Sequence, residues 1–150
     1  MILSAAMQIF AEGIAIAEGF FVAGSRAARN HNPGNLTLDI THTGISKDGM
    51  FIVYANDNDG WNALRKQVEL ILTNASGIYN SQMTLRQIGQ KYASTSTPDE
   101  QLNWAINVAS KLGINIDTPV STLLTTAATT IGFGVLLVFV VLWYLNKEKH

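Results

Sequence analysis

The chain has 150 residues, of which 47% are hydrophobic and only 14% are charged, with a formal net charge of −1 and no cysteine. These values exclude a disordered chain, which needs low hydrophobicity or high net charge. They also exclude disulfide scaffolds, thiolate metal sites and cysteine nucleophiles, and without clustered basic residues we expect no nucleic-acid partner.

The first predicted element is an apolar helix over roughly residues 3–20. Apolar side chains recur there every three or four residues, which is the spacing of one helix face. Gly19 is the expected end of the helix. The next segment, residues 21–35, contains Gly, Asn and Pro, and we expect it to be a loop.

Two short segments then predict a β-hairpin. Leu36–Thr41 alternates with a period of two, and Met50–Tyr54 is rich in residues that favour strands. The turn residues GISKDG, at positions 44–49, lie between them. We therefore expect these two segments to pair as antiparallel strands.

Three helices are predicted after the hairpin. The first follows the turn at residues 56–60 and carries apolar side chains at helical spacing from Trp61 to Leu72. The second begins with a capping box, in which Thr84 and Gln87 satisfy free backbone N–H groups.

The third of these helices has the clearest limits. Thr97 and Glu100 form its capping box with Pro98 between them, and Gly113 ends it. Its expected apolar stripe is Leu102, Ala105, Ile106, Ala109 and Leu112. Together the elements predict a mainly helical α+β domain over residues 1–119.

A membrane span is predicted after this domain. Residues 123–145 form an uncharged, predominantly apolar run of 23 residues, which as a helix is about 34 Å long and can cross a hydrocarbon core of about 30 Å. Trp143 and Tyr144 lie at its end, where interfacial aromatic residues are common. We expect residues 120–145 to be a single transmembrane anchor in the lipid bilayer, followed by a short polar tail, residues 146–150.

The charges around this span predict its orientation. Lys147 and Lys149 follow it, so the positive-inside rule favours a cytoplasmic tail and a domain on the far side of the membrane. Without anchor and tail, the domain has eight basic and ten acidic residues, a net charge of −2. The low charged fraction of the whole chain therefore averages a charge-poor domain with a charge-free span.

Glu18 is the candidate catalytic residue on physical grounds. It lies at the end of an apolar helix, where partial desolvation should raise the pKa of its carboxyl group. The negative end of the helix dipole also disfavours an anion there. A carboxyl group that stays protonated near neutral pH can protonate the leaving oxygen of a glycosidic bond. The ordinary alternative is a solvated glutamate at a helix end.

The residues around Glu18 carry a family signature. The helix end AIAEGF, at positions 15–20, is followed by RNHNPGNL at positions 29–36. This pair of segments resembles the A-x-x-E-G-[FW] and R-N-x-N-P-G-N-[LI] patterns of phage-associated lytic transglycosylases of the lysozyme-like superfamily. Softer matches, which mostly reflect packing, extend the resemblance to about residues 12–121.

The resemblance implies a lysozyme-like fold that cleaves peptidoglycan. Glu18 would be the general acid/base that cleaves the β-1,4 bond between N-acetylmuramic acid and N-acetylglucosamine. Asn32, Gly34 and Asn35 would line the cleft floor that faces it, and Tyr92 would stack or hydrogen-bond along the cleft. The ordinary alternatives are turn formation for the asparagines and core packing for Tyr92.

Two positions depart from the family pattern. Ser94 stands where the family usually has a proline, and Trp104 stands where it has a tyrosine. Both differences concern the substrate side of the cleft. Three scattered histidines without a cysteine give no metal-ligand spacing, so we expect neither a metal nor a cofactor.

Two mechanisms are open at this point. A lytic transglycosylase needs one glutamate and uses the muramyl O6 hydroxyl as an internal nucleophile, which gives a 1,6-anhydro product. A muramidase, which is a hydrolase, needs a second carboxylate at a defined separation, and Asp39 is the best candidate. We favour the transglycosylase.

The expected partners are peptidoglycan glycan strands and, through residues 123–145, a lipid bilayer; the residues indicate no oligomeric state. The expected location is a phage virion membrane or a bacterial inner membrane, with the catalytic domain facing the murein. There it would open the cell wall locally as a phage enters or leaves. Two alternatives are a non-catalytic glycan-binding virion membrane protein and a holin-like lysis protein whose span is the active part.

Overall fold

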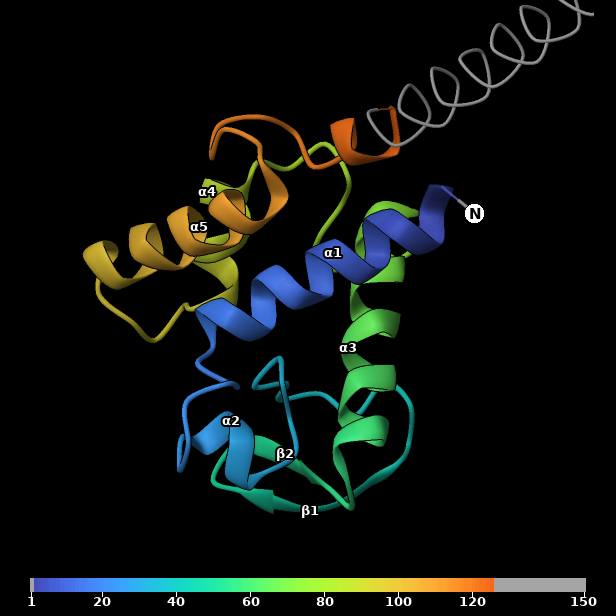
Figure 1. The fold of residues 1–150 in the computed structure, drawn as a ribbon, viewed down its shortest axis with the longest axis vertical. Helices are drawn as coiled ribbons and strands as arrows, with labels where there is room; N and C mark the ends of the chain where they lie inside the picture. The colour runs from blue at the N-terminus through green and yellow to red at the C-terminus, as the bar shows by residue number, and fades with distance from the viewer. Residues whose placement is uncertain (1, 126–150) are drawn as a thin grey trace, which may run out of the picture.

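The computed structural model describes residues 2–125, which form a mixed domain of helices with one small antiparallel sheet (Figure 1). About half of these residues are helical. The expected combination of helices and one β-hairpin is therefore confirmed. The elements are α1 (Ile2–Ala17), α2 (Arg26–Arg29), β1 (Gly44–Asp48), β2 (Phe51–Tyr54), α3 (Asp57–Leu72), α4 (Leu85–Tyr92) and α5 (Pro98–Leu112).

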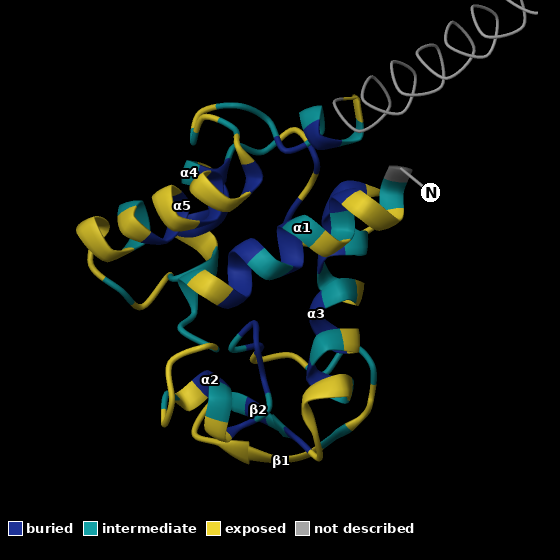
Figure 2. Cartoon of the chain, in the orientation of Figure 1, coloured by how far each residue is buried: buried dark blue, intermediate teal, exposed yellow. Residues whose placement is uncertain are grey.

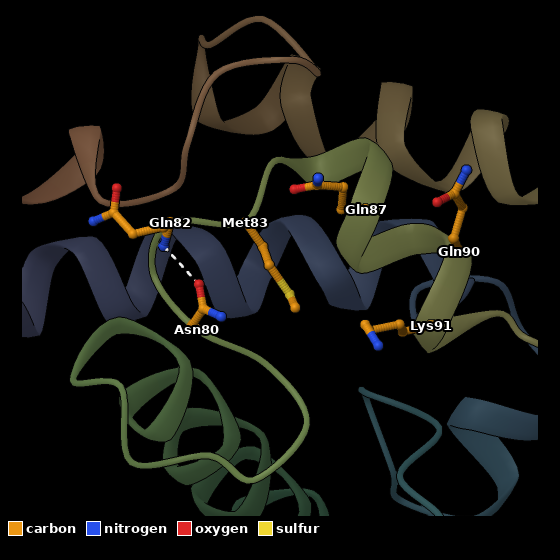
Figure 3. A pocket seen from close by; sticks show the side chains of 6 residues that line it. All are labelled: Asn80, Gln82, Met83, Gln87, Gln90 and Lys91. Atoms are coloured by element: carbon orange, nitrogen blue, oxygen red, sulfur yellow. Dashed lines mark hydrogen bonds between the residues drawn. The ribbon is translucent and has the colours of Figure 1, made fainter.

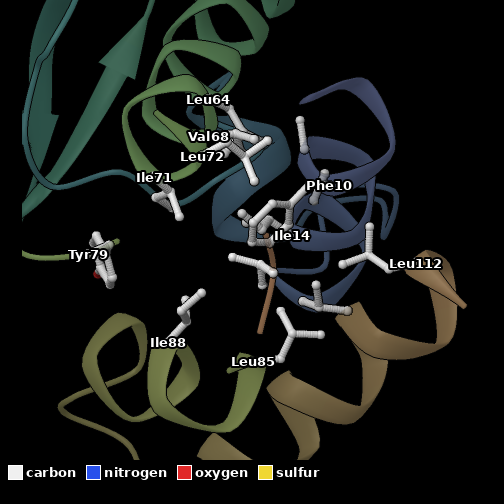
Figure 4. Close-up of a cluster of buried hydrophobic side chains, with 14 of the residues drawn as sticks. Phe10, Ile14, Leu64, Val68, Ile71, Leu72, Tyr79, Leu85, Ile88 and Leu112 are labelled. Atoms are coloured by element: carbon white, nitrogen blue, oxygen red, sulfur yellow. The ribbon is translucent and has the colours of Figure 1, made fainter. Parts of the chain in front are cut away.

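The core forms around α1, which packs against both α3 and α5, while α4 packs against α5 (Figure 1). Phe10 and Ile14 of α1 are fully buried among side chains from α3, α4 and α5 (Figure 4). Buried and exposed residues alternate along α3 and α5, as expected for helices with one face in the core (Figure 2). Full burial of one such side chain contributes about 1.5–3 kcal/mol, so this core holds the helices in place.

The predicted starts of α4 and α5 are confirmed, whereas α3 begins at Asp57, inside the segment 56–60 that was expected to be a turn, because the Asn56 side chain caps it there. Thr84 and Gln87 form a capping box at α4, and Thr97 and Glu100 form another at α5. Gly113 ends α5 in the left-handed conformation, with φ of 67°. The expected stripe of α5 is partly wrong, because Ile106 is 46% exposed, whereas Trp104 and Val108 are buried.

The position of the first strand is corrected. β1 covers Gly44–Asp48, inside the segment expected to be the turn, and residues 36–41 form no strand. The Asp39 carboxylate accepts hydrogen bonds from the Thr43 and Gly44 N–H groups at 3.3 and 3.0 Å, so it turns the chain where alternation predicted a strand. The actual hairpin turn is residues 49–50, where Gly49 has φ of 61°.

The loop expected at residues 21–35 contains a short helix, α2. The Ser25 hydroxyl accepts a hydrogen bond from the Ala28 N–H at 3.1 Å and caps its first turn. This single turn of helix brings the chain to the segment that faces Glu18.

The predicted anchor and tail, residues 120–145 and 146–150, lie outside the described residues except for residues 120–125. Within residues 2–125, no helix combines the length and the hydropathy needed to cross a bilayer. Val120 and Leu123 are buried in the domain core. The packed chain therefore continues beyond the boundary expected at residue 119.

Gly60 lies in α3, where the loop at residues 31–33 lies against the helix. A Cβ at this position would overlap the His31 carbonyl oxygen and lie 2.9 Å from Pro33 Cδ. We expect Gly60→Ala to lower the free energy of unfolding by about 1–3 kcal/mol through overpacking, although alanine is the better helix former. Urea denaturation of the full-length chain measures the change.

Gly77→Ala is the matched control, because a Cβ at residue 77 meets no atom within 4 Å. Its free energy of unfolding should remain within about 0.5 kcal/mol of that of the wild type. Equal stability of the two variants would contradict the close contact between the loop and α3.

Candidate active site

Glu18 follows the last residue of α1 and keeps the helical hydrogen bond from its N–H to the Ile14 carbonyl at 2.9 Å. Gly19, with φ of 72°, then turns the chain away from the helix axis. The Glu18 side chain is half-buried. The helix therefore presents one carboxyl group at its end, at the edge of the core.

Both carboxyl oxygens of Glu18 accept a hydrogen bond from another part of the chain. The Asn35 side-chain amide donates to Oε2 at 2.8 Å, and the Trp104 indole N–H donates to Oε1 at 2.8 Å. Asn35 comes from the loop after α2, and Trp104 comes from α5. Three segments that are distant in sequence thus meet at one carboxyl group.

The pKa of Glu18 is raised above its ordinary value, mainly because burial disfavours the charged carboxylate. The hydrogen bonds from Asn35 and Trp104 favour the carboxylate and partly oppose this rise. The net effect keeps Glu18 protonated to a higher pH than a solvated glutamate. This is the protonation behaviour that a general acid needs.

Asn32 gives the loop its shape. Its side-chain amide is fully buried and donates to the Leu36 and Ile52 carbonyls at 3.0 and 2.8 Å. Its Oδ1 accepts the Leu36 N–H at 2.8 Å. Asn35 has φ of 44°, a left-handed conformation that asparagine tolerates better than most residues. The backbone held by Asn32 thus places the Asn35 amide against Glu18.

Tyr92, the last residue of α4, joins this loop to the helices. Its hydroxyl donates to the Gly34 carbonyl at 2.6 Å. A Cβ at residue 34 would lie 2.9 Å from that hydroxyl and 2.8 Å from Leu64 Cδ1, so only glycine fits here without displacement. Burial, and then the negative charge of Glu18, raise the pKa of Tyr92 well above the ordinary value. The hydroxyl therefore remains protonated and continues to donate.

The Tyr92 ring also positions Trp104. The two rings are stacked, with centroids 5.0 Å apart and an interplanar angle of 27°. Tyr79 is the second aromatic neighbour of Tyr92, and the centroids of these two rings lie 6.3 Å apart. This stack restricts the orientation of the indole and so directs its N–H toward Glu18.

A cleft of about 420 Å³ opens beside the Glu18 carboxyl group. One part of its lining belongs to α2, the loop after it, the hairpin and α3, and the other belongs to the end of α4 and the segments before and after that helix. Among residues 2–125, Glu18 is the only acidic residue of the lining, and Arg26 and Lys91 are its basic residues. The other lining residues are Asn35, Leu36, Thr37, Leu38, Met50, Phe51, Gln67, Ile78, Tyr79, Tyr92, Ala93, Ser94, Thr95 and Ser96.

The structure brings three of the five expected site residues to this cleft: Glu18, Asn35 and Tyr92. Asn32 and Gly34 are buried and do not line it. They lie in the same loop and support it through the contacts described above. Asn32 and Gly34 thus shape the loop that carries Asn35 rather than line the cleft.

Asp39, the candidate second carboxylate, does not line the cleft. Its two oxygens accept backbone hydrogen bonds within its own turn. Within residues 2–125, no group of three or more His, Cys, Asp or Glu side chains is placed to hold a metal ion. The acidic chemistry available in the cleft is therefore that of Glu18.

Trp104 is the site residue that sequence reasoning missed. The sequence identifies it only as a departure from the tyrosine of the family pattern that the chain resembles. A signal was present, because helical spacing places it on the same face as Val108 and Leu112, and a buried indole N–H usually needs a hydrogen-bond partner. Nothing in the local sequence indicates that this partner is Glu18, 86 residues away.

No family model, curated protein or solved structure matches this chain. The functional inference therefore stands on the geometry around Glu18 and on the motif resemblance.

Replacement of Glu18 by glutamine tests its burial. A carboxyl group whose pKa is raised by folding costs stability once the pH rises through its unfolded and then its folded pKa. We therefore expect Glu18→Gln to unfold less readily than the wild type at pH 7, with the difference vanishing below about pH 4, near the ordinary glutamate pKa. Urea denaturation across this pH range measures both effects.

Glu12→Gln is the matched control on the same helix. The pKa of Glu12 is lowered, chiefly by its hydrogen bond with Lys111, so its charged form stabilises the fold above the ordinary glutamate pKa and this contribution is lost as the pH falls. The Glu12 variant should thus gain no stability at pH 7. A Glu18 variant that is less stable than the wild type at pH 7 would be incompatible with a buried acid.

Proposed function

We propose that this chain is a peptidoglycan lytic transglycosylase with a lysozyme-like fold and that Glu18 is its general acid/base. It cleaves the β-1,4 bond between N-acetylmuramic acid and N-acetylglucosamine. The observation that carries the proposal is a single glutamate in a cleft, withdrawn from water and held by two N–H donors. The resemblance of residues 15–20 and 29–36 to the family patterns supports the same residue.

The hydrogen bonds favour Oε2 as the oxygen of Glu18 that carries the proton. The Trp104 indole can only donate, so Oε1 must remain an acceptor and the proton resides on Oε2, beside Asn35. The Asn35 Oδ1 is buried without a hydrogen-bond partner. In its present orientation the Asn35 side-chain amide donates its N–H to the Glu18 carboxylate. If the amide group turns by 180°, its Oδ1 accepts a hydrogen bond from the protonated Oε2 instead. Asn35 thus serves both protonation states.

In the proposed reaction, Glu18 Oε2 gives its proton to the glycosidic oxygen as the bond from that oxygen to the muramyl C1 breaks. The muramyl O6 then bonds to C1, and the O6 proton passes to the Glu18 carboxylate. The acid is regenerated and a 1,6-anhydro ring is formed. Every proton is accounted for without a second carboxylate.

The surroundings of Asp39 favour this route over hydrolysis. Glycosidases that use two carboxylates hold them about 5–9.5 Å apart across the scissile bond. Asp39 does not line the cleft, and its oxygens are engaged in a turn. A muramidase reaction on the same site remains the alternative that product analysis distinguishes.

The setting of the reaction is part of the proposal. The uncharged run at residues 123–145 supports a single membrane anchor. Such an anchor places the domain next to a phage virion membrane or a bacterial inner membrane, facing the murein. The role we propose is local opening of the cell wall as a phage enters or leaves the cell.

Digestion of purified sacculi by the full-length chain tests the function. We expect soluble fragments with anhydromuramyl ends by mass spectrometry, whereas reducing ends would identify a muramidase. Glu18→Gln should lower the rate by about 10²–10⁴-fold, the usual contribution of general acid/base catalysis. Glu12→Gln should retain activity, because Glu12 is absent from the cleft lining.

Two results would contradict the proposal. Undiminished activity of Glu18→Gln would mean that another group is the acid. A wild-type chain that pelleted with sacculi but released nothing would be a non-catalytic glycan-binding protein.

A further inference from the structure

A second hollow, of about 500 Å³, borders the cleft at the α4 end of the domain. Its lining comes from the segment before α4 and from α4 itself (Figure 3). The lining residues are Asn80, Gln82, Met83, Gln87, Gln90 and Lys91.

The hollow and the cleft adjoin along two segments of chain and share the lining residue Lys91. Ile78 and Tyr79 line the cleft, and the next residue, Asn80, lines the hollow. On α4, Lys91 lines both, and Tyr92 lines the cleft. A ligand bound beside Glu18 can therefore extend past Lys91 into the hollow without leaving the surface.

The hollow has a different chemistry from the cleft. Four of its six lining residues carry a side-chain amide. The amide oxygens of Asn80 and Gln87 already accept the Gln82 and Thr84 N–H groups, so these two residues offer a ligand their N–H donors, whereas an amide such as that of Gln90 can both donate and accept. Among the residues that the structure describes, the lining contains no aromatic ring and no acidic residue. Such amides match the alternating N–H and C=O groups of a peptide. A hollow of this kind suits a peptide better than a further sugar ring that stacks on aromatic faces.

Lys91 supplies a positive charge where the hollow meets the cleft. Within residues 2–125 its ammonium group makes no ion pair, whereas Lys66 pairs with Glu69 and Lys111 pairs with Glu12. The domain as a whole carries a net negative charge. The positive charge of Lys91, where the hollow meets the cleft, is therefore opposite in sign to that of the domain. It is available to a carboxylate of a ligand.

We propose that the hollow binds the peptide stem that N-acetylmuramic acid carries and that Lys91 pairs with a carboxylate of this stem. The inference rests on the proposed function, because it assumes a muramyl residue beside Glu18. It adds a substrate preference to that function, namely glycan that still bears its peptides over bare glycan.

Lys91→Met tests the pairing, because methionine keeps much of the length of the side chain and removes its charge. The substrates are glycan strands with intact peptides and the same strands stripped of peptides by an amidase. We expect Lys91→Met in the full-length chain to raise KM for peptide-bearing strands about tenfold, the usual effect of one charge-assisted hydrogen bond. Lys91 also lines the cleft, so its effect on stripped strands measures its contribution there, and the rise in KM on peptide-bearing strands should clearly exceed that effect.

Two further variants control this experiment. Gln90→Met removes one amide from the hollow and should also raise KM only for peptide-bearing strands. Lys47→Met removes an exposed lysine of β1 that lines neither the hollow nor the cleft, so it should change nothing. Equal effects of Lys91→Met on both substrates, or no effect on either, would overturn the inference while leaving the proposed function intact.

A binding measurement keeps the inference testable without turnover. Calorimetry compares the affinity of Glu18→Gln for a peptide-bearing muropeptide and for its bare disaccharide, with and without Lys91→Met. We expect the peptide to strengthen binding and Lys91→Met to abolish this gain. If the wild type cleaves neither type of strand, the proposed function fails, and this comparison alone decides the peptide site. Equal affinities for the two ligands would overturn it.

Discussion

The candidate site depends on one constraint: a carboxyl group, that of Glu18, lies half-buried at the end of an apolar helix. Burial and the helix dipole both disfavour its charge, so it needs partners that accommodate two protonation states. Trp104 can only donate a hydrogen bond, whereas the Asn35 amide can donate or accept one. This pair leaves one carboxyl oxygen as a fixed acceptor and the other free to carry the proton.

The remaining contacts around Glu18 hold these two partners in place. Asn32 fixes the backbone that carries Asn35, and Tyr92 connects the two sides of the site by donating to the loop and stacking on Trp104. The acid is therefore positioned by the loop after α2 and by α5, and Tyr92 contacts both, through a hydrogen bond to the loop and by stacking on Trp104. A side chain at Gly34 would disturb both partners at once, because it would displace the Tyr92 hydroxyl.

The features that the sequence predicted correctly depend on neighbours along the chain. The capping boxes of α4 and α5 need residues only three positions apart, as at Thr84 and Gln87. The first strand of the hairpin was predicted at the wrong residues. The alternation over residues 36–41 carries no information about the turn in which the Asp39 carboxylate accepts the following backbone N–H groups. The motif predicted Glu18 and Asn35 as site residues. The hydrogen bond from the Trp104 indole to Glu18 could not be predicted in this way, because it joins residues 86 positions apart that only tertiary packing brings together.

The pKa of the Glu18 carboxyl group in the full-length chain tests the central claim most directly. Carbon-13 NMR titration of this group, followed together with the Trp104 indole N–H resonance, measures it. The account predicts a pKa above that of a solvated glutamate and an indole resonance that titrates at the same pH. A Glu18 pKa at or below the ordinary value, with an indole resonance insensitive to that titration, would contradict it.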